Sequence, residues 1–226
     1  MHPKQVLLLL IFSCQIAAGS AASLFKNGKT DYTIVIARNA SQSEQTAAKE
    51  LQLYLKQISD ADFPLSNNLN HTGKAIFIGH NNRTAQLTGT KKPSNSDEGF
   101  TYQTVGDNLV IIGGRNRGTM YGVFSFLENE LGVRWYTADF TKVPRLKTFQ
   151  FHELARHEQP FIPYRYTLYY HCEDDKRWAA HNKNNFQWSL QRNEYGGSDA
   201  CLGAHTMPEY IPENLYNEHP ESFALR

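Results

Sequence analysis

A glycine-rich loop, residues 113–118 (G-G-R-N-R-G), has a composition that suggests phosphate chemistry. Glycines at the start of a helix can leave backbone amides free to bind a phosphate group. The spacing G-G-x-x-x-G differs, however, from the G-x-G-x-x-G of dinucleotide-binding loops, and the G-K-[ST] of the Walker loop is missing. Both nucleotide motifs also follow a strand of a parallel sheet, whereas a predicted antiparallel hairpin precedes this loop. We therefore predict no nucleotide ligand and a structural loop, whose glycines allow a tight turn and positive φ.

Cysteine and histidine residues do not have the spacing of a metal site. Cys172 and Cys201 lie near His171 and His205 in the sequence, but no C-x-x-C or H-x-x-x-H pair is present. Two cysteines are too few for a disulfide scaffold, although in an oxidising compartment they pair if the fold brings them together. The sequence predicts no metal ion and no other cofactor, and it leaves the pairing of the two cysteines open.

The N-terminus has the organisation of a secretory signal peptide. A short basic region precedes an unbroken apolar run, residues 6–12, and small residues follow. The run is too short to span a bilayer. Ile11-Phe12-Ser13-Cys14 is similar to a bacterial lipobox, in which the cysteine is acylated, whereas cleavage within residues 17–21 would release a soluble protein. Residues 1–22 are thus predicted to direct export to the periplasm or outer membrane, with lipidation of Cys14 as one of two outcomes.

Composition argues against a nucleic-acid partner. The 23 lysine and arginine residues nearly balance the 22 aspartate and glutamate residues, which gives a net charge of +1. Aromatic residues make up 12% of the chain, a share that suits either sugar stacking or an aromatic core. A membrane contact is expected only through the lipid anchor.

Short strands and two amphipathic helices are predicted between residues 23 and 151. Strands are predicted at residues 33–37 and 75–79, and the capping box Ser41-Gln42-Ser43-Glu44 opens the first helix. The apolar stripe of this helix consists of Ala47, Leu51, Tyr54, Leu55 and Ile58, and Glu44, Lys49, Glu50 and Lys56 lie off it. An edge segment is predicted at residues 63–65 and a short helix or turn at residues 81–89.

Residues 97–136 supply the rest of this domain. A hairpin of residues 100–105 and 109–112 leads into the glycine loop. The following helix has Met120, Val123, Phe124, Leu127 and Leu131 at three- and four-residue spacings and ends at Gly132, before a strand at residues 133–136. The simplest compact arrangement is a two-layer α+β domain over residues 23–151, with two helices on one face of a mixed or antiparallel sheet.

The pattern changes after the domain. Residues 152–163 are predicted to be a proline-marked linker, and residues 164–170 a strand. Glu173-Asp174-Asp175 favours the start of a helix that includes Trp178, and residues 200–206 are predicted to form another strand. Residues 164–226 therefore have the pattern of the first strand–helix units of a barrel, without its completion.

Residues 97–137 carry a family resemblance. The pattern D-E-G-F-x-x-x-T-V-G-D-N-L-V-I-I-G-G-x-x-R-G-T-M-Y-G-V-F-S-F-L-E, followed by L-G-V-R-W-Y-T, resembles the small α+β domain that precedes the barrel in α-glucuronidases and β-N-acetylhexosaminidases. The motifs Q-P-F-x-x-x-R and H-P-E-S-F-A-L extend this resemblance to the C-terminus. It implies a glycoside hydrolase family 67-type N-terminal domain beside a (β/α)₈ barrel, which needs about 250 residues.

The resemblance also implies which residues meet the substrate. In these families two carboxylates on later barrel strands hydrolyse the glycosidic bond, so no catalytic residue is assigned here, and Glu173-Asp174-Asp175 is interpreted as a solvated helix start. Arg165 is expected to bind sugar hydroxyls, although Tyr166 replaces the glycine of the hexosaminidase pattern. His205 either donates to a sugar or is structural, and Trp178 either contacts the sugar or packs its helix.

Together these features predict the N-terminal portion of an exported glycoside hydrolase that resembles α-glucuronidases and acts on oligo- or polysaccharides. We expect the 226-residue chain itself to be catalytically inactive. The alternative is a complete non-catalytic module that binds carbohydrate or a partner protein. Arg115 and Arg117, between the loop glycines, are expected to face the barrel.

Overall fold

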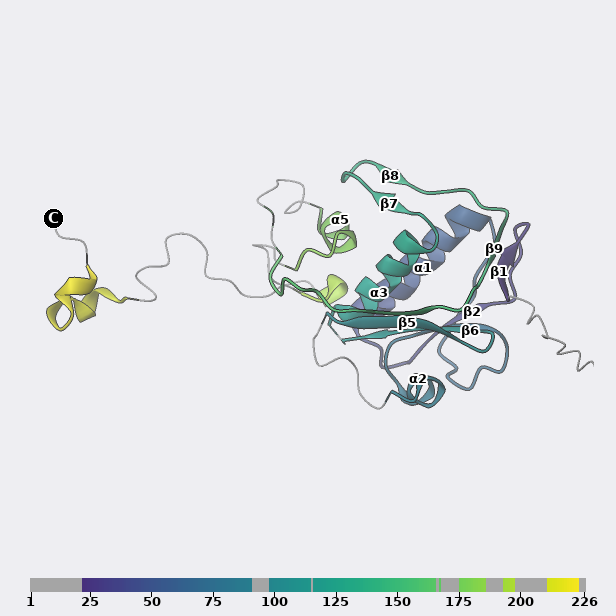
Figure 1. Cartoon of the computed structure of the whole chain (residues 1–226), viewed down its shortest axis with the longest axis horizontal. Coiled ribbons are helices and arrows are strands. Elements are labelled where there is room, and N and C mark those ends of the chain that lie inside the picture. Colours follow the sequence, from purple (N-terminus) through teal and green to yellow (C-terminus); the bar gives the residue numbers. More distant parts are fainter. Residues whose placement is uncertain are drawn as a thin grey trace, which may run out of the picture.

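A six-stranded mixed sheet forms the centre of the part of the chain that the computed structural model describes (Figure 1). The described residues are 22–90, 98–114, 116–165, 167, 175–185, 193–197 and 211–223. The strands of this sheet are β2 (Thr33–Ile36), β3 (Leu65–Ser66), β4 (Ala75–Ile78), β5 (Phe100–Val105), β6 (Asn108–Gly113) and β10 (Ala155–Glu158). In the order β10-β5-β6-β4-β2-β3, the last four run parallel and β5 is antiparallel to both its neighbours. The predicted mixed sheet and its hairpin are thus confirmed.

Side chains of the central strands alternate between two buried faces. Ile76 and Ile78 of β4 join the larger core, whereas Phe77 between them joins a smaller cluster with Val110 of β6. This period of two is that of a pleated strand. Burial on both faces explains why these strands consist of unbroken apolar residues.

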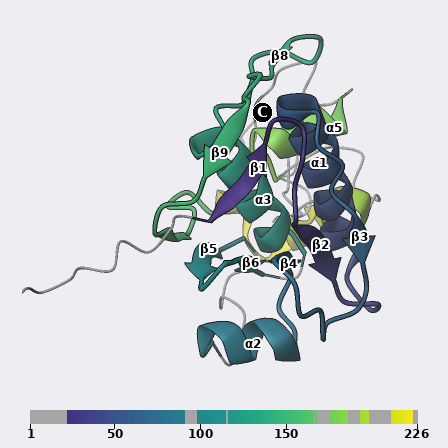
Figure 2. The same cartoon turned by 90° about the vertical axis from the view of Figure 1, so that its right-hand side faces the viewer.

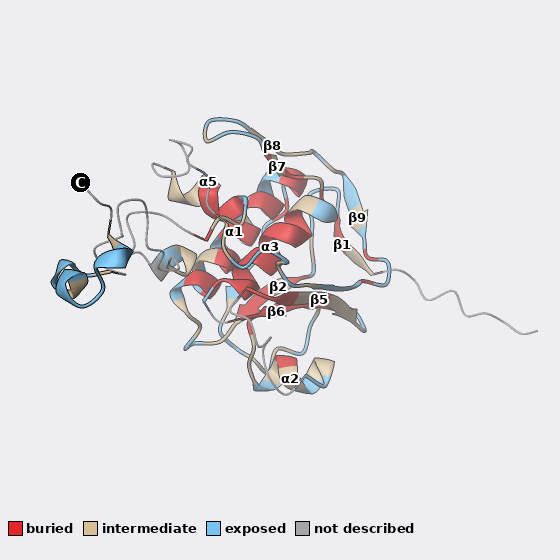
Figure 3. Ribbon diagram, turned by 60° about the vertical axis from the view of Figure 1, so that its left-hand side comes forward, coloured by how far each residue is buried: buried red, intermediate tan, exposed pale blue. Residues whose placement is uncertain are grey.

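Two long helices cover the larger core, and a short third helix lies on the other side of the sheet (Figure 2). Helices α1 (Gln42–Ser59) and α3 (Gly118–Asn129) pack against each other on that face. Helix α2 (Asn82–Thr88) lies on the opposite face, where its Leu87 packs against the smaller cluster. The α+β architecture with two helices on one face is confirmed, and α2 adds partial cover to the other face. Burial is concentrated in α1, α3 and the sheet (Figure 3).

The start of α1 follows its sequence signal, whereas the end of α3 does not. The Ser41 hydroxyl accepts the Glu44 amide hydrogen at 3.3 Å, while the Glu44 carboxylate accepts the Ser41 amide at 2.8 Å. This is the predicted capping box, which satisfies two backbone donors at the start of α1. α3 ends earlier than predicted, with Glu130 as its C-cap, and Gly132, whose φ is 76°, lies two residues beyond that cap.

The first glycine of the glycine-rich loop is required by close packing. A Cβ atom on Gly113 would lie 2.6 Å from the amide nitrogen of Thr119 and 2.7 Å from the carbonyl oxygen of Gly99. Gly113, Gly114 and Gly118 all have negative φ, so the prediction of positive φ in this loop is wrong. A glycine is needed because the end of β6 contacts the backbone at the start of α3.

Two small antiparallel sheets lie beside the helices. β1 (Ser23–Lys26) pairs with β9 (Thr148–Gln150), and β7 (Arg134–Trp135) pairs with β8 (Thr141–Lys142). The strand predicted at residues 133–136 therefore forms, but outside the main sheet. The predicted linker, residues 152–163, contains β10, because the free edge of β5 offers it backbone hydrogen bonds.

Short helical elements follow the linker. They are α5 (Lys176–His181), η1 (Asn193–Tyr195), η2 (Glu213–Asn217) and η3 (Pro220–Ser222). Asp175 caps α5 by accepting the Trp178 amide at 2.9 Å, in line with the predicted acidic helix start.

The predicted start of a barrel is not confirmed by the described residues. Of the strand predicted at residues 164–170, the described residues 164, 165 and 167 do not belong to a strand, and residues 200–206 lie outside the described part. None of the helices in the described ranges is long and apolar enough to cross a membrane.

Candidate functional site

Two buried carboxylates of the α+β domain bind basic residues that follow the linker. Glu98, just before β5, contacts Arg117 and Arg165, and these three residues are called the Glu98 cluster. Glu50 of α1 contacts Arg177 and His181, and these form the Glu50 cluster. Each cluster joins residues that are far apart in the sequence, so each fixes the position of the segment after the linker on the domain.

The Glu98 cluster places one carboxylate between two guanidinium groups. Arg117 donates from Nε to Glu98 Oε1 at 2.8 Å, and Arg165 donates from Nη2 to Oε2 at 2.7 Å. Glu98 and Arg117 are only 5% and 4% exposed. Charge-assisted hydrogen bonds of this kind are stronger than neutral ones, and they replace the water that burial removes.

Arg165 makes several further contacts within the protein. It donates from Nε to the Lys183 carbonyl and from Nη1 to the Ile162 carbonyl, both at 2.8 Å. Its guanidinium lies 5.9 Å from the centre of the Tyr121 ring. The geometry assigns Arg165 a positioning role between the linker and the domain, and its predicted contact with sugar hydroxyls stays a prediction.

Arg117 extends the cluster to η1. Its Nη1 donates to the carbonyl oxygens of Gly196 and Gly197, each at 3.4 Å. Arg117 shares Glu98 with Arg165, whereas the predicted contact of the loop arginines with a barrel stays a prediction. Arg115 lies outside the described residues.

Tyr121 of α3 forms the floor of this cluster. Its side chain is fully buried, and its hydroxyl donates to the Asn184 carbonyl at 3.2 Å. Burial, and then the nearby Glu98 carboxylate, raise the pKa of Tyr121 well above its usual value. The phenol therefore stays protonated and acts as a donor.

The Glu50 cluster combines a bidentate arginine with a histidine. Arg177 donates from Nε to Oε1 at 2.8 Å and from Nη2 to Oε2 at 3.0 Å, and His181 Nε2 lies 3.1 Å from Oε2. Burial opposes ionisation of Glu50, but the hydrogen bonds from His181 and Arg177 outweigh it and lower the pKa of this carboxyl group. Glu50 is consequently ionised at neutral pH.

His181 is enclosed by aromatic rings. It stacks on Trp135 with ring centres 4.5 Å apart and an interplanar angle of 17°, and the Phe124 ring meets it edge-on at 4.6 Å. Burial lowers the pKa of His181 more than the Glu50 carboxylate raises it. The imidazole is therefore neutral at neutral pH, with the Nε2 proton donated to Glu50.

Trp178 lies at the edge of this aromatic cluster. Its indole nitrogen donates to the Trp135 carbonyl at 3.1 Å, and its half-buried ring packs against the main core. Trp135 in turn donates to the Tyr54 hydroxyl at 2.7 Å. Of the two interpretations of Trp178, the structure shows the packing role, and a sugar contact stays a prediction.

Several predicted residues are not described by the structure. Cys14, His171, Cys172, Glu173, Asp174, Cys201 and His205 lie outside the described residues. Their predicted roles, including lipidation of Cys14 and sugar binding by His205, are not tested by this structure.

Local sequence patterns do not identify the two carboxylates as partners of distant basic residues. Glu50 was expected off the apolar stripe of α1, but it is only 9% exposed because α5 covers that side of the helix. Glu98 stood inside the matched pattern D-E-G-F without an assigned role. The only sequence signal for Glu98 is that an acidic residue precedes a buried strand. This signal does not identify its partners Arg117 and Arg165, which lie 19 and 67 residues further along the chain.

The α+β domain matches a known family. Residues 21–126 match the model described as the glycosyl hydrolase family 67 N-terminus. These residues are similar to a family 67-type N-terminal domain. The resemblance predicted from residues 97–137 is thereby confirmed for this domain, which is related to those of glycoside hydrolases. A comparison with curated proteins gave no match.

A solved structure shares the fold. BtGH115A, described as a family GH115 4-O-methyl-α-glucuronidase with specificity for decorated arabinogalactans, is 19% identical, with a TM-score of 0.51 over 62% of this chain and 19% of that one. Two β-N-acetylhexosaminidase structures have lower scores. A mutant Streptomyces plicatus enzyme has 13% identity and a TM-score of 0.32 over 49% of this chain and 18% of that one. The GH20 enzyme of Streptomyces coelicolor A3(2) has 11% identity and a TM-score of 0.36 over 61% and 23%.

The present chain thus spans about a fifth of the length of these solved structures. At such low identity the likeness to BtGH115A shows the fold alone.

Proposed function

We propose that this chain is the N-terminal portion of an exported glycoside hydrolase that resembles α-glucuronidases and acts on oligo- or polysaccharides. The observation that carries the proposal is the match of residues 21–126 to the family 67 N-terminus. The fold shared with the α-glucuronidase BtGH115A supports it. The organisation of residues 1–22 supports export, with lipidation of Cys14 as one possible form of attachment to a membrane.

Within such an enzyme, the α+β domain would hold the start of the catalytic part. The Glu98 cluster fixes Arg165 immediately after the linker, and the Glu50 cluster fixes α5 about a dozen residues later. Two attachment points hold a segment in both position and direction, whereas one would leave it free to turn. The domain therefore contributes orientation, and the chemistry belongs to the barrel.

Apolar surface on the linker supports the same proposal. Phe161 is 99% exposed and Ile162 is 59% exposed, although both are large apolar residues. Exposed apolar residues next to each other commonly mark a surface that another part of a protein covers. The linker lies beside the segment in which a barrel would begin, so further barrel strands are the expected cover.

The test compares this chain with a longer protein that continues into the barrel. We expect the longer protein to release 4-nitrophenol from an aryl α-glucuronide and the 226-residue chain to release none above background. A longer protein in which two strand-end carboxylates are replaced is the matched control. Hydrolysis by the 226-residue chain alone, or no hydrolysis of any aryl glycoside by the longer protein, would contradict the proposal.

A further inference from the structure

A pocket lies where the chain leaves β2 and β4, at the carboxyl ends of these parallel strands. β2 leads into α1 on one face of the sheet and on to β3, whereas β4 leads into α2 on the opposite face and on towards β5 and β6. The two neighbouring strands thus send the chain in opposite directions. In open sheets with parallel strands, such a switch point opens a crevice that commonly binds a ligand.

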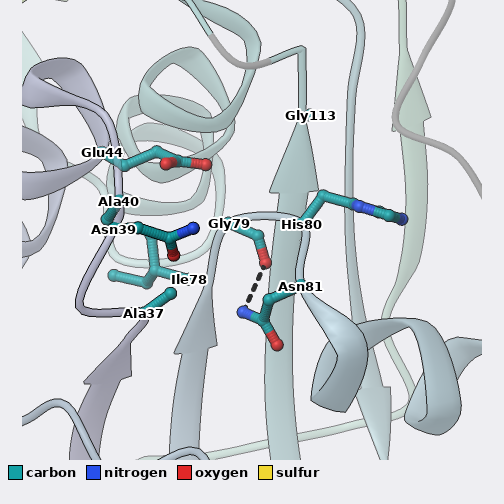
Figure 4. A pocket seen from close by; sticks show the side chains of 9 residues that line it. All are labelled: Ala37, Asn39, Ala40, Glu44, Ile78, Gly79, His80, Asn81 and Gly113. Atoms are coloured by element: carbon teal, nitrogen blue, oxygen red, sulfur yellow. Dashed lines mark hydrogen bonds between the residues drawn. The ribbon is translucent and has the colours of Figure 1, made fainter.

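The pocket has the size of one six-membered ring. Its volume is about 140 Å³, and a cavity of about 150 Å³ is known to take a benzene molecule. Figure 4 shows the residues that line it, which are Ala37, Asn39, Ala40, Glu44, Ile78, Gly79, His80, Asn81 and Gly113. The Glu44 carboxylate reaches over the strand ends into the pocket, while the His80 imidazole points away from the other lining side chains.

Glu44 provides an acceptor in the wall of this pocket. The residue is only 7% exposed. Its Oε2 accepts the Ser41 amide at 2.8 Å, whereas no donor from the described residues reaches Oε1. Oε1 is not among the fully buried polar atoms of the described residues that lack a partner, so solvent in the pocket reaches it, and a ligand hydroxyl can take the place of that water.

Gly79 allows this carboxylate to lie there. A Cβ atom on Gly79 would be 2.5 Å from Glu44 Oε1, and the φ of Gly79 is 85°. The Gly79 carbonyl already accepts the Asn81 side-chain amide at 3.2 Å (Figure 4). The open acceptor that a ligand meets is therefore Oε1 of Glu44.

The charge of Glu44 determines the class of ligand. Glu44 stands in the first turn of α1, where its negative charge offsets the positive end of the helix dipole. An anion such as phosphate or a uronate would be repelled by the carboxylate. An ammonium group would gain little binding energy, because the positive end of the helix dipole already offsets the negative charge of Glu44. A neutral ligand with hydroxyl donors fits both the acceptor and the charge.

We propose that this pocket binds one neutral sugar unit, which donates a hydroxyl hydrogen to Glu44 Oε1. The choice of a sugar among hydroxylated ligands rests on the proposed function, while the place and the acceptor rest on the geometry of the pocket. The domain would then hold one unit of a glycan in addition to orienting the barrel.

The test is a titration of the isotope-labelled full chain with neutral monosaccharides, followed by ¹H–¹⁵N NMR. Galactose, arabinose, xylose and glucose are compared with glucuronate and with ethylammonium. We expect saturable shifts of the Gly79, His80 and Gly113 amides with at least one neutral sugar, and none with glucuronate. The absence of shifts with every neutral sugar, or a response to ethylammonium alone, would overturn the proposal.

Two variants locate the binding site. Glu44→Gln keeps an oxygen for the Ser41 amide but places an NH₂ group where the open acceptor was, so binding should weaken about tenfold or more. Ala40→Leu fills the rim without altering the capping box and should abolish the shifts. Glu153→Gln, at an exposed carboxylate outside the pocket, is the matched control and should bind as the wild type does.

The outcome with Ala40→Leu decides the proposal even if Glu44→Gln fails to fold. Unchanged shifts in this variant would show that the sugar binds elsewhere and would overturn the assignment. The result is also separable from the proposed function, because hydrolysis by the longer protein does not require this pocket. If the longer protein hydrolyses a glycoside but the α+β domain binds no neutral sugar, this inference alone is refuted and the proposed function stands.

Discussion

The Glu98 and Glu50 clusters perform the same task with different chemistry. Glu98 is shared by two arginines, whose charges do not change in the physiological pH range. Glu50 is shared by one arginine and a buried, neutral histidine. Both partners of Glu98 therefore keep their charge, whereas one partner of Glu50 is an imidazole whose pKa is lowered by burial.

Burial also differs between the two clusters. Arg117 has a side chain only 5% exposed, whereas the side chain of Arg177 is 42% exposed. A buried guanidinium that loses its carboxylate cannot recover its hydration, but a half-exposed one can. The Glu98 cluster, which is nearest the linker, is therefore the more costly one to break.

Removal of the Glu98 carboxylate should have the largest effect. In Glu98→Ala the buried Arg117 loses its carboxylate, and such a change costs about 3–5 kcal/mol of unfolding free energy. Urea unfolding followed by circular dichroism measures this cost. Glu153→Ala, at an exposed position, should change the free energy by less than about 0.5 kcal/mol. A loss below about 1 kcal/mol in Glu98→Ala would mean that the cluster is already hydrated.

Removal of the Glu50 carboxylate should cost less. Glu50→Ala frees a half-exposed Arg177 and leaves His181 as an unpaired neutral donor, so we expect a loss of about 1–3 kcal/mol. The same urea experiment ranks the two variants. A Glu50→Ala variant that is less stable than Glu98→Ala would reverse the comparison and would place the main attachment at α5.

The sequence predicted the elements of the fold better than their contacts. The apolar run of residues 75–78, the capping box at Ser41 and the stripe of α1 are local patterns, and each of these three produced the expected element. Strand β10 was missed because its sequence, Ala155–Glu158, has exposed, mostly charged residues and no apolar alternation. It is a strand because it pairs with β5, and a sequence does not display a pairing of that kind.

The two carboxylate clusters depended on contacts that are even less local. Arg165 was singled out by resemblance, but its partner Glu98 lies 67 residues away. Glu50 follows the helical periodicity of a solvent-facing residue, and its burial comes from α5, which is 127 residues further along the chain at Arg177. Helical periodicity shows which residues face the domain's own sheet, and it gives no information on a second surface that another segment covers.

Acidification should weaken the Glu50 cluster specifically. The folded-state pKa of His181 is lower than its usual value, so the unfolded chain binds more protons as the pH falls below about 6.5. The stabilising contribution of neutral His181 is therefore complete above that pH and is lost as the pH falls towards the folded-state pKa. Urea midpoints between pH 7.5 and 5.5 measure the slope.

The variant His181→Phe tests the origin of this slope. It keeps the ring on Trp135 but has no group that titrates, so its urea midpoint should fall less over that pH range than the wild-type midpoint. Glu98→Gln is the matched control, because it alters the other cluster and should retain the wild-type slope. An equal slope in His181→Phe would assign the pH dependence to another group.

The exchange of arginine for lysine should have the smallest effect and should separate geometry from charge. In Arg177→Lys the charge stays, but one ammonium group replaces two parallel hydrogen bonds to Glu50. Because the side chain is 42% exposed, solvent screens the loss, and we expect only about 0.5 kcal/mol. Arg117→Lys, in the buried cluster, should cost several times more, since the bonds from Nε to Glu98 and from Nη1 to the Gly196 and Gly197 carbonyls are lost together without access to water. Equal losses of unfolding free energy in the two variants would mean that burial does not distinguish the clusters. The titration of His181 would then be the only difference left between them.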